Sequence, residues 1–111
     1  MTPLLPERRH HTVERRNLAM HRAIAVKLRQ EPELLAHART HLDHWRGRDG
    51  RSTPWLTAWR NILNLPFKDL LDTIQEDSER MAALRQYTPL AGLLTAEERW
   101  EIYATMPVSL P

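Results

Sequence analysis

Three histidines have the spacing in this sequence that most directly suggests chemistry. His37, His41 and His44 stand at i, i+4 and i+7, which places three imidazoles along one face of a helix. His37 and His41 have a spacing that bridges a transition metal, but a third ligand on one straight helix rarely reaches the same ion. No HExxH pattern adds a general base. We therefore expect a solvated or pH-sensitive polar face, with metal binding as the alternative.

Arginines of the first half of the chain form the second candidate site. Residues 1–50 contain ten bases and six acids, whereas residues 51–111 contain six bases and eight acids. A basic region of this kind attracts phosphate or an acidic partner. Three of the arginines recur every seven residues, so they share one side of a helix. The residues expected to contact phosphates or an acidic partner are Arg8, Arg9, Arg15, Arg16, Arg22 and Arg29.

The string RNLAMH, from Arg16 to His21, suggests a catalytic alternative. It resembles the Arg-x4-6-His signature of the HEPN family of helical ribonucleases, including the polar residue after the arginine. This resemblance implies that Arg16 holds phosphate and that His21 assists proton transfer. The likeness covers six residues, and Arg39 and His44 have the same spacing.

Capping residues and prolines predict where the helices that carry these residues begin and end. A first helix runs from Thr12 to about Gln30, because Glu31 and Pro32 interrupt it. A second helix is predicted to begin near Pro32 and to end where Gly47 and Gly50 make the main loop. Further helices are predicted after Thr53, after Pro66, and over residues 96–106 behind the capping box of Thr95 and Glu98. Ser78 caps a short additional helix, or the preceding helix continues through it.

Apolar periodicity indicates a helical core. Leucine, isoleucine and methionine recur at i, i+3, i+4 and i+7, and no segment alternates with period two. The tryptophans Trp45, Trp55, Trp59 and Trp100 follow this pattern and are expected in the core, although one or two are candidates for exposed interface anchors. The predicted fold is all-α: a flexible basic arm over residues 1–11, one compact domain of five or six short helices over 12–106, and a tail over 107–111.

Composition supports one globular domain and excludes several classes of protein. The chain has 111 residues, of which 41% are hydrophobic and 27% are charged, and it has no cysteine. Disulfides, thiolate metal sites and a cysteine nucleophile are therefore excluded. There is neither a GxSxG elbow nor a phosphate-binding glycine loop, so we expect no enzyme and no cofactor. No apolar stretch is long enough for a signal peptide or a membrane span, so we expect a cytoplasmic protein.

Two longer segments resemble a known family. They are RRNLAMHRAIAVKLRQEPELLAHARTHLDHW and DSERMAALRQYTPLAGLLTAEERWEIY, and together they cover more than half of the chain. Both are similar to a family of small, largely uncharacterised bacterial proteins associated with toxin–antitoxin-type gene pairs. The resemblance implies a helical interaction protein and assigns no functional residues.

These observations lead to a hypothesis with two alternatives. The hypothesis is a non-catalytic interaction protein of the antitoxin kind, which binds a partner protein such as a cognate toxin, and DNA where its basic half meets phosphates. The first alternative is the HEPN-like ribonuclease that uses Arg16 and His21. The second is a structural homo-oligomer held together by an apolar stripe left over from core packing.

Overall fold

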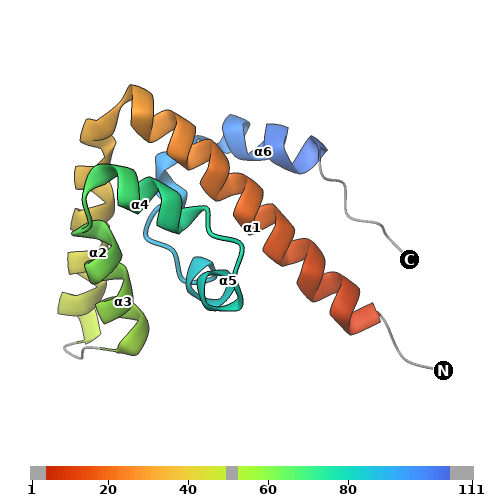
Figure 1. Cartoon of the computed structure of the whole chain (residues 1–111), viewed down its shortest axis with the longest axis horizontal. Coiled ribbons are helices and arrows are strands. Elements are labelled where there is room, and N and C mark those ends of the chain that lie inside the picture. Colours follow the sequence, from red (N-terminus) through yellow and green to blue (C-terminus); the bar gives the residue numbers. More distant parts are fainter. Residues whose placement is uncertain (1–4, 50–52, 106–111) are drawn as a thin grey trace.

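The computed structural model describes the backbone of residues 5–49 and 53–105 and the side chains of residues 12–45 and 53–105. All regular structure in these ranges is helical, as predicted, and it forms a single globule (Figure 1). The elements are α1 (Leu5–Gln30), η1 (Pro32–Leu34), α2 (Leu35–Asp49), α3 (Pro54–Leu63), α4 (Phe67–Ile74), α5 (Glu79–Arg85), η2 (Ala91–Leu93) and α6 (Ala96–Thr105). None of the described helices combines the length and apolar character needed to cross a lipid bilayer.

The long helix α1 organises the molecule. It runs diagonally across the structure, with α4 and α5 against one side and α6 alongside another (Figure 1). The hairpin of α2 and α3 lies at its C-terminal end. The first turns of α1 project beyond the other helices, and this gives the molecule its elongated outline (Figure 1).

The start of α1 differs from the prediction. Residues 1–11 were expected to form a flexible arm, with a helix from Thr12, but the helix begins at Leu5. Pro6 falls in the first turn, where a helix needs no backbone N–H donor, so this proline does not delay the start. Met106 and the predicted tail over 107–111 lie outside the described residues.

The capping signals of Thr53 and Thr95 are confirmed, and of the two alternatives at Ser78 the structure shows the cap, whereas Thr12 lies inside α1. Thr53 and Ser78 accept hydrogen bonds from backbone N–H groups three residues later, at 3.3 and 3.2 Å. Ser78 therefore begins a separate helix, α5. The capping box before α6 is complete, because Thr95 accepts from the Glu98 N–H at 3.1 Å and Glu98 Oε1 accepts from the Thr95 N–H at 2.7 Å.

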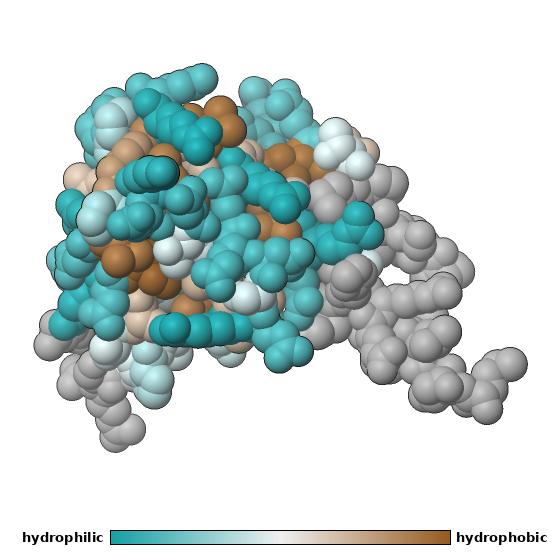
Figure 2. Space-filling view, in the orientation of Figure 1, coloured by the Kyte–Doolittle hydropathy of each residue, from teal (hydrophilic) through white to brown (hydrophobic). Residues whose placement is uncertain are grey.

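The core forms where the apolar sides of the helices meet beneath α1. Trp59 of α3 lies at its centre, is fully buried, and donates from Nε1 to the carbonyl of Leu84 at 2.9 Å. Trp45 and Trp55 are half-buried at the edge of this core, so the predicted placement is confirmed only in part for them. The other large core side chains are Ile24, Leu28, Leu63, Leu70, Ile74 and Leu90. The face seen in Figure 2 is mainly hydrophilic, with small apolar areas between the polar side chains.

Trp59→Phe tests this account of the core. The substitution removes the indole donor to the Leu84 carbonyl, which keeps its hydrogen bond from the Tyr87 N–H at 3.0 Å, and it opens a small cavity. The free energy of unfolding should therefore fall by roughly 1–3 kcal/mol. Trp100→Phe, at an exposed site, should change it by less than about 0.5 kcal/mol. Urea denaturation of both variants measures the difference, and equal effects would contradict the assignment of Trp59 as the central core residue.

Candidate functional site

An exposed cluster of aromatic and basic side chains joins α1 to α6. The guanidinium carbon of Arg16 lies 4.8 Å from the centre of the Tyr103 ring, a cation–π contact. Trp100 packs edge-on against the same tyrosine, with ring centres 6.3 Å apart at an angle of 79°. Trp100 is 72% exposed, which makes it the most exposed large apolar side chain of the described residues. We call Arg16, Trp100 and Tyr103 the α1–α6 cluster.

Local interactions hold α6 in place even though none of its residues is fully buried. Lys27 of α1 and Glu98 of α6 form an ion pair with 2.7 Å between nitrogen and oxygen. Hydrogen bonds from Lys27 and from the Thr95 backbone lower the pKa of the Glu98 carboxyl below its ordinary value, so the group stays ionised at neutral pH. Ile102 packs against the edge of the core. Trp100 and Tyr103 also line a shallow surface hollow of about 190 Å³ on α6.

The core placement predicted for Trp100 is wrong. On α6, Glu98, Arg99, Ile102 and Tyr103 are half-buried, and they form the side of the helix that faces α1. Trp100 lies about 100° around the helix from Arg99 and points to solvent. Apolar residues on both sides of so short a helix cannot all face the same neighbour. The alternative of an exposed anchor therefore applies to Trp100.

The six arginines predicted to bind do not form one surface. Arg15, Arg22 and Arg29 are exposed along α1, as their spacing of seven predicted, and we call them the arginine stripe. Arg16 leaves this line for the α1–α6 cluster, where its Nε is buried and has no hydrogen-bond partner among the described residues. The side chains of Arg8 and Arg9 lie outside the described residues, although both positions belong to α1.

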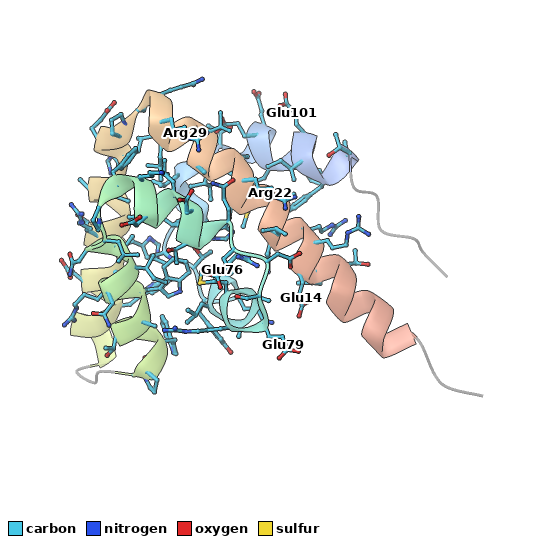
Figure 3. The ribbon with its side chains drawn as sticks, viewed as in Figure 1. Glu14, Arg22, Arg29, Glu76, Glu79 and Glu101 are labelled. Atoms are coloured by element: carbon cyan, nitrogen blue, oxygen red, sulfur yellow. The ribbon has the colours of Figure 1, made fainter. Side chains whose placement is uncertain are left out.

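Acidic side chains accompany the arginine stripe. Arg15 and Arg22 line a hollow of about 400 Å³ whose other charged residues are Glu14, Asp77, Glu79 and Arg85. Figure 3 shows Glu14 on α1 itself and Glu79 on α5, the neighbouring helix. The hollow therefore carries equal numbers of acids and bases. This balance weakens the attraction for the continuous row of phosphates in a nucleic acid.

His21 is fully buried, and its environment keeps it neutral. Its Nδ1–H donates to the Asn17 carbonyl at 2.6 Å, and Nε2 accepts from the Thr88 hydroxyl at 2.9 Å. Desolvation by burial lowers the pKa of His21 from 6.5 to about 4, against the opposing effect of the Asn17 hydrogen bond. The positive charge of Arg85 lowers this pKa further. The histidine does not reach the surface. The geometry therefore gives no support to a ribonuclease site in which Arg16 holds phosphate and His21 transfers a proton.

Arg85 is a structural residue that the sequence reading missed. Its side chain is 2% exposed, and Nη1 donates to the carbonyls of Ile74 and Glu76 at 3.2 and 2.8 Å. Burial lowers its pKa, while Asp77 is the main charge that opposes this shift. The spacing of four residues from Met81 is the only sequence signal for its inward position. Arg85 holds the turn between α4 and α5 in place.

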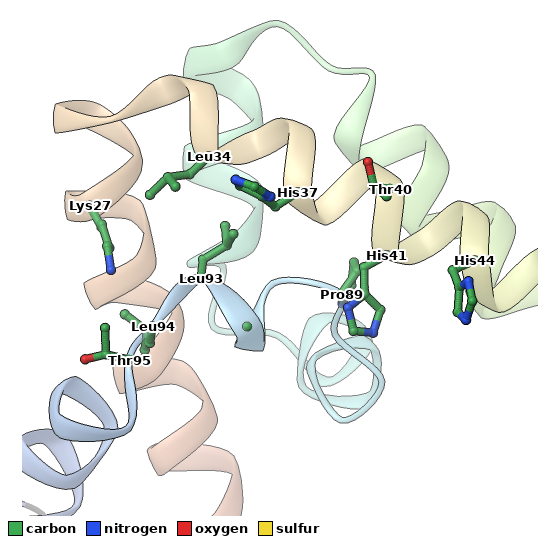
Figure 4. A pocket seen from close by; sticks show the side chains of 11 residues that line it. Lys27, Leu34, His37, Thr40, His41, His44, Pro89, Leu93, Leu94 and Thr95 are labelled. Carbon is green, nitrogen blue, oxygen red and sulfur yellow. The ribbon is translucent and has the colours of Figure 1, made fainter.

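The three histidines of α2 are exposed and face one side, as predicted. His37, His41 and His44 line a pocket together with the segment around η2 (Figure 4). Within the described part of the chain, no group of three or more histidine, aspartate or glutamate side chains is placed to hold a metal ion. One side of His41 also packs edge-on against Trp45, with ring centres 4.5 Å apart.

The buried neutral state of His21 predicts a stability that depends on pH. The pKa is lower in the folded than in the unfolded chain, so acid favours unfolding as the pH falls from about 6.5 towards 4. Between about pH 7 and pH 4.5 this group should cost roughly 2 kcal/mol of unfolding free energy. Urea denaturation of the wild type and of His21→Gln isolates the contribution. The lowered pKa predicts that the NMR signals of the His21 ring stay constant between about pH 7 and pH 5.5. A shift of these signals in that range would contradict the prediction.

We compared the chain with known protein families, sequences and structures. The chain matches no protein-family model, no curated protein sequence and no solved structure.

Proposed function

We propose that this chain is a protein-interaction module of the antitoxin kind, which binds an amphipathic, partly acidic segment of a partner protein at the α1–α6 cluster. The observation that carries the proposal is the exposure of Trp100 next to an arginine already positioned on a tyrosine ring. Tryptophan, tyrosine and arginine are the residues most enriched among those that dominate binding energy at protein interfaces.

The cluster is arranged so that binding orders few groups. The Tyr103 ring contacts Arg16 on one side and Trp100 on another, so both side chains have restricted freedom before a partner arrives. A smaller loss of conformational entropy on binding leaves more of the contact energy as affinity. The hollow beside Trp100 holds an apolar side chain of the partner, and the Arg16 guanidinium donates hydrogen bonds to a carboxylate of the partner.

The projecting start of α1 extends this surface. Its first turns lie beyond α5 and α6 (Figure 1). Arg8 and Arg9 belong to these turns, and Val13, which is 48% exposed, follows them on α1. This chemistry favours a partner helix with an apolar side and acidic residues next to it.

A protein is favoured over nucleic acid as the ligand because the surface has mixed charge. Glu97 and Glu101 are exposed on α6, and acids balance the bases in the hollow beside the arginine stripe. A protein partner can match separate positive and negative groups, whereas a nucleic acid presents phosphates throughout. DNA binding by the arginine stripe is therefore a competing outcome of the test.

The antitoxin part of the proposal comes from the sequence resemblance. The first of the two segments similar to the toxin–antitoxin-associated family contains Arg16, and the second contains Trp100 and Tyr103. Both segments thus contribute to the α1–α6 cluster. On this view the partner is the cognate toxin.

Trp100→Ala should weaken binding to the partner about 10- to 100-fold, because it removes the central anchor of the interface. The tagged chain is purified from its native cells with nuclease treatment, the retained protein is identified, and the dissociation constant of the reconstituted pair is measured by calorimetry. Arg16→Gln should also weaken binding. Phe67→Ala, at a partly exposed aromatic residue of α4, serves as the matched control and should leave the affinity unchanged.

Three results would overturn the proposal. The first is a partner that binds Trp100→Ala and wild type equally well. The second is a complex that dissociates on nuclease treatment, which would move the function to DNA and the arginine stripe. The third is a purified chain that cleaves RNA, or one that only self-associates in sedimentation experiments, which would favour the ribonuclease or the homo-oligomer.

A further inference from the structure

A separate pocket lies away from the α1–α6 cluster, between α2 and the segment around η2. Its volume is about 630 Å³, within the range of roughly 300–1,000 Å³ typical of small-molecule sites. It is lined by residues of α1, η1, α2 and the segment from Pro89 to Thr95 (Figure 4). Because four parts of the chain meet here, the pocket exists only in the folded protein.

The floor of the pocket is apolar. Leu93 and Leu94 are buried beneath it, and Pro89 is buried beside His41 (Figure 4). Leu34 closes the floor on the side of η1. Apolar carbon of a ligand placed here would leave water and lie against side chains that are already fixed by the core.

The rim of the pocket consists of hydrogen-bonding groups without an acid among its lining residues. His37, His41 and His44 occupy successive turns of α2 along one wall (Figure 4). Lys27 stands at the opposite end, where its ammonium is paired at 2.7 Å with Glu98 of α6. The segment around η2 contributes no charged group to the lining. The rim therefore offers imidazole donors and one ammonium whose charge is already compensated.

We propose that this pocket binds a small monocarboxylate with a short apolar chain, of which a medium-chain fatty acid is the simplest example. The apolar chain lies on Leu34, Leu93 and Leu94, and the carboxylate accepts hydrogen bonds from His37 and His41. A single negative charge fits this rim better than a phosphate dianion, because Glu98 already compensates the charge of Lys27. A neutral polar ligand would leave the apolar floor poorly covered.

Gly92 provides a direct test, because it lines the pocket and has open space above it. A Cβ atom built at this position meets no heavy atom within 4 Å. Gly92→Phe should therefore be tolerated at its Cβ and add a ring to the lining of the pocket, where the ring competes with a ligand for space. Ala83→Phe, at an exposed position of α5 outside the lining, is the matched control for an added surface ring.

The experiment titrates octanoate into the full-length protein and follows amide NMR shifts and the heat of binding. Octanoate should shift the amide signals of Leu93 and Leu94. Octanol, the neutral analogue, should bind at least about tenfold more weakly than octanoate. Gly92→Phe should reduce the octanoate affinity at least about tenfold, and so should the double change His37→Gln with His41→Gln. Ala83→Phe and Trp100→Ala should leave it unchanged.

Several results would overturn this inference. One is that octanoate shifts amide signals elsewhere on the protein and not those of Leu93 and Leu94. Another is that octanol binds as tightly as octanoate. A third is that neither Gly92→Phe nor the double histidine change reduces the octanoate affinity. Circular dichroism and the melting temperature establish whether each variant folds. If Gly92→Phe does not fold, the histidine variant and the comparison with octanol decide the question. Failure here leaves the proposed partner site untouched, since Trp100 is not part of the pocket.

Discussion

The burial of His21 against Trp59 is the constraint on which the rest of the structure depends. The two rings are stacked with centres 6.4 Å apart, and each has a polar partner elsewhere in the chain. His21 is hydrogen-bonded to Thr88, and Trp59 donates to Leu84. These contacts tie α1 and α3 to α5 and the segment that follows it. Since an unpaired polar group in a core costs about 1–3 kcal/mol, both hydrogen bonds restrict how these elements pack.

The two proposed sites follow from this packing. Thr88, fixed by His21, also accepts from the Leu90 N–H at 3.0 Å, and this orients the segment that leads into η2. That segment forms one wall of the histidine-lined pocket and then enters α6 through the capping box of Thr95 and Glu98. The ion pair of Glu98 with Lys27 holds α6 against α1, where Trp100 and Tyr103 meet Arg16. The stretch from Pro89 to Tyr103 thus contributes first to the pocket and then to the cluster, and the two sites have no lining residue in common.

Burial assigns different roles to residues that look alike in the sequence. Among the tryptophans, Trp59 is a core residue, Trp45 and Trp55 border the core, and Trp100 is open to solvent. Among the arginines, Arg85 supports a turn from inside the protein, whereas the arginine stripe lies outside. Buried Arg85 and His21 have their pKa values lowered by desolvation. Residue type alone therefore did not separate a structural group from a candidate binding group.

The sequence by itself determined the all-helical class and most of the helix boundaries, but not the start of α1 at Leu5. The caps Thr53, Ser78 and Thr95 and the heptad spacing of the arginine stripe act within one or two turns, so their effects can be read locally. The tertiary structure decided which side of each helix was covered. Trp100 was predicted to be buried because its neighbours are apolar, but α6 has only one side against α1. His21 was predicted as a catalytic alternative because of its spacing from Arg16, but its partner Thr88 lies 67 residues away. The physical reason is that helix formation depends on neighbours three or four residues apart, whereas burial depends on where distant helices come to rest.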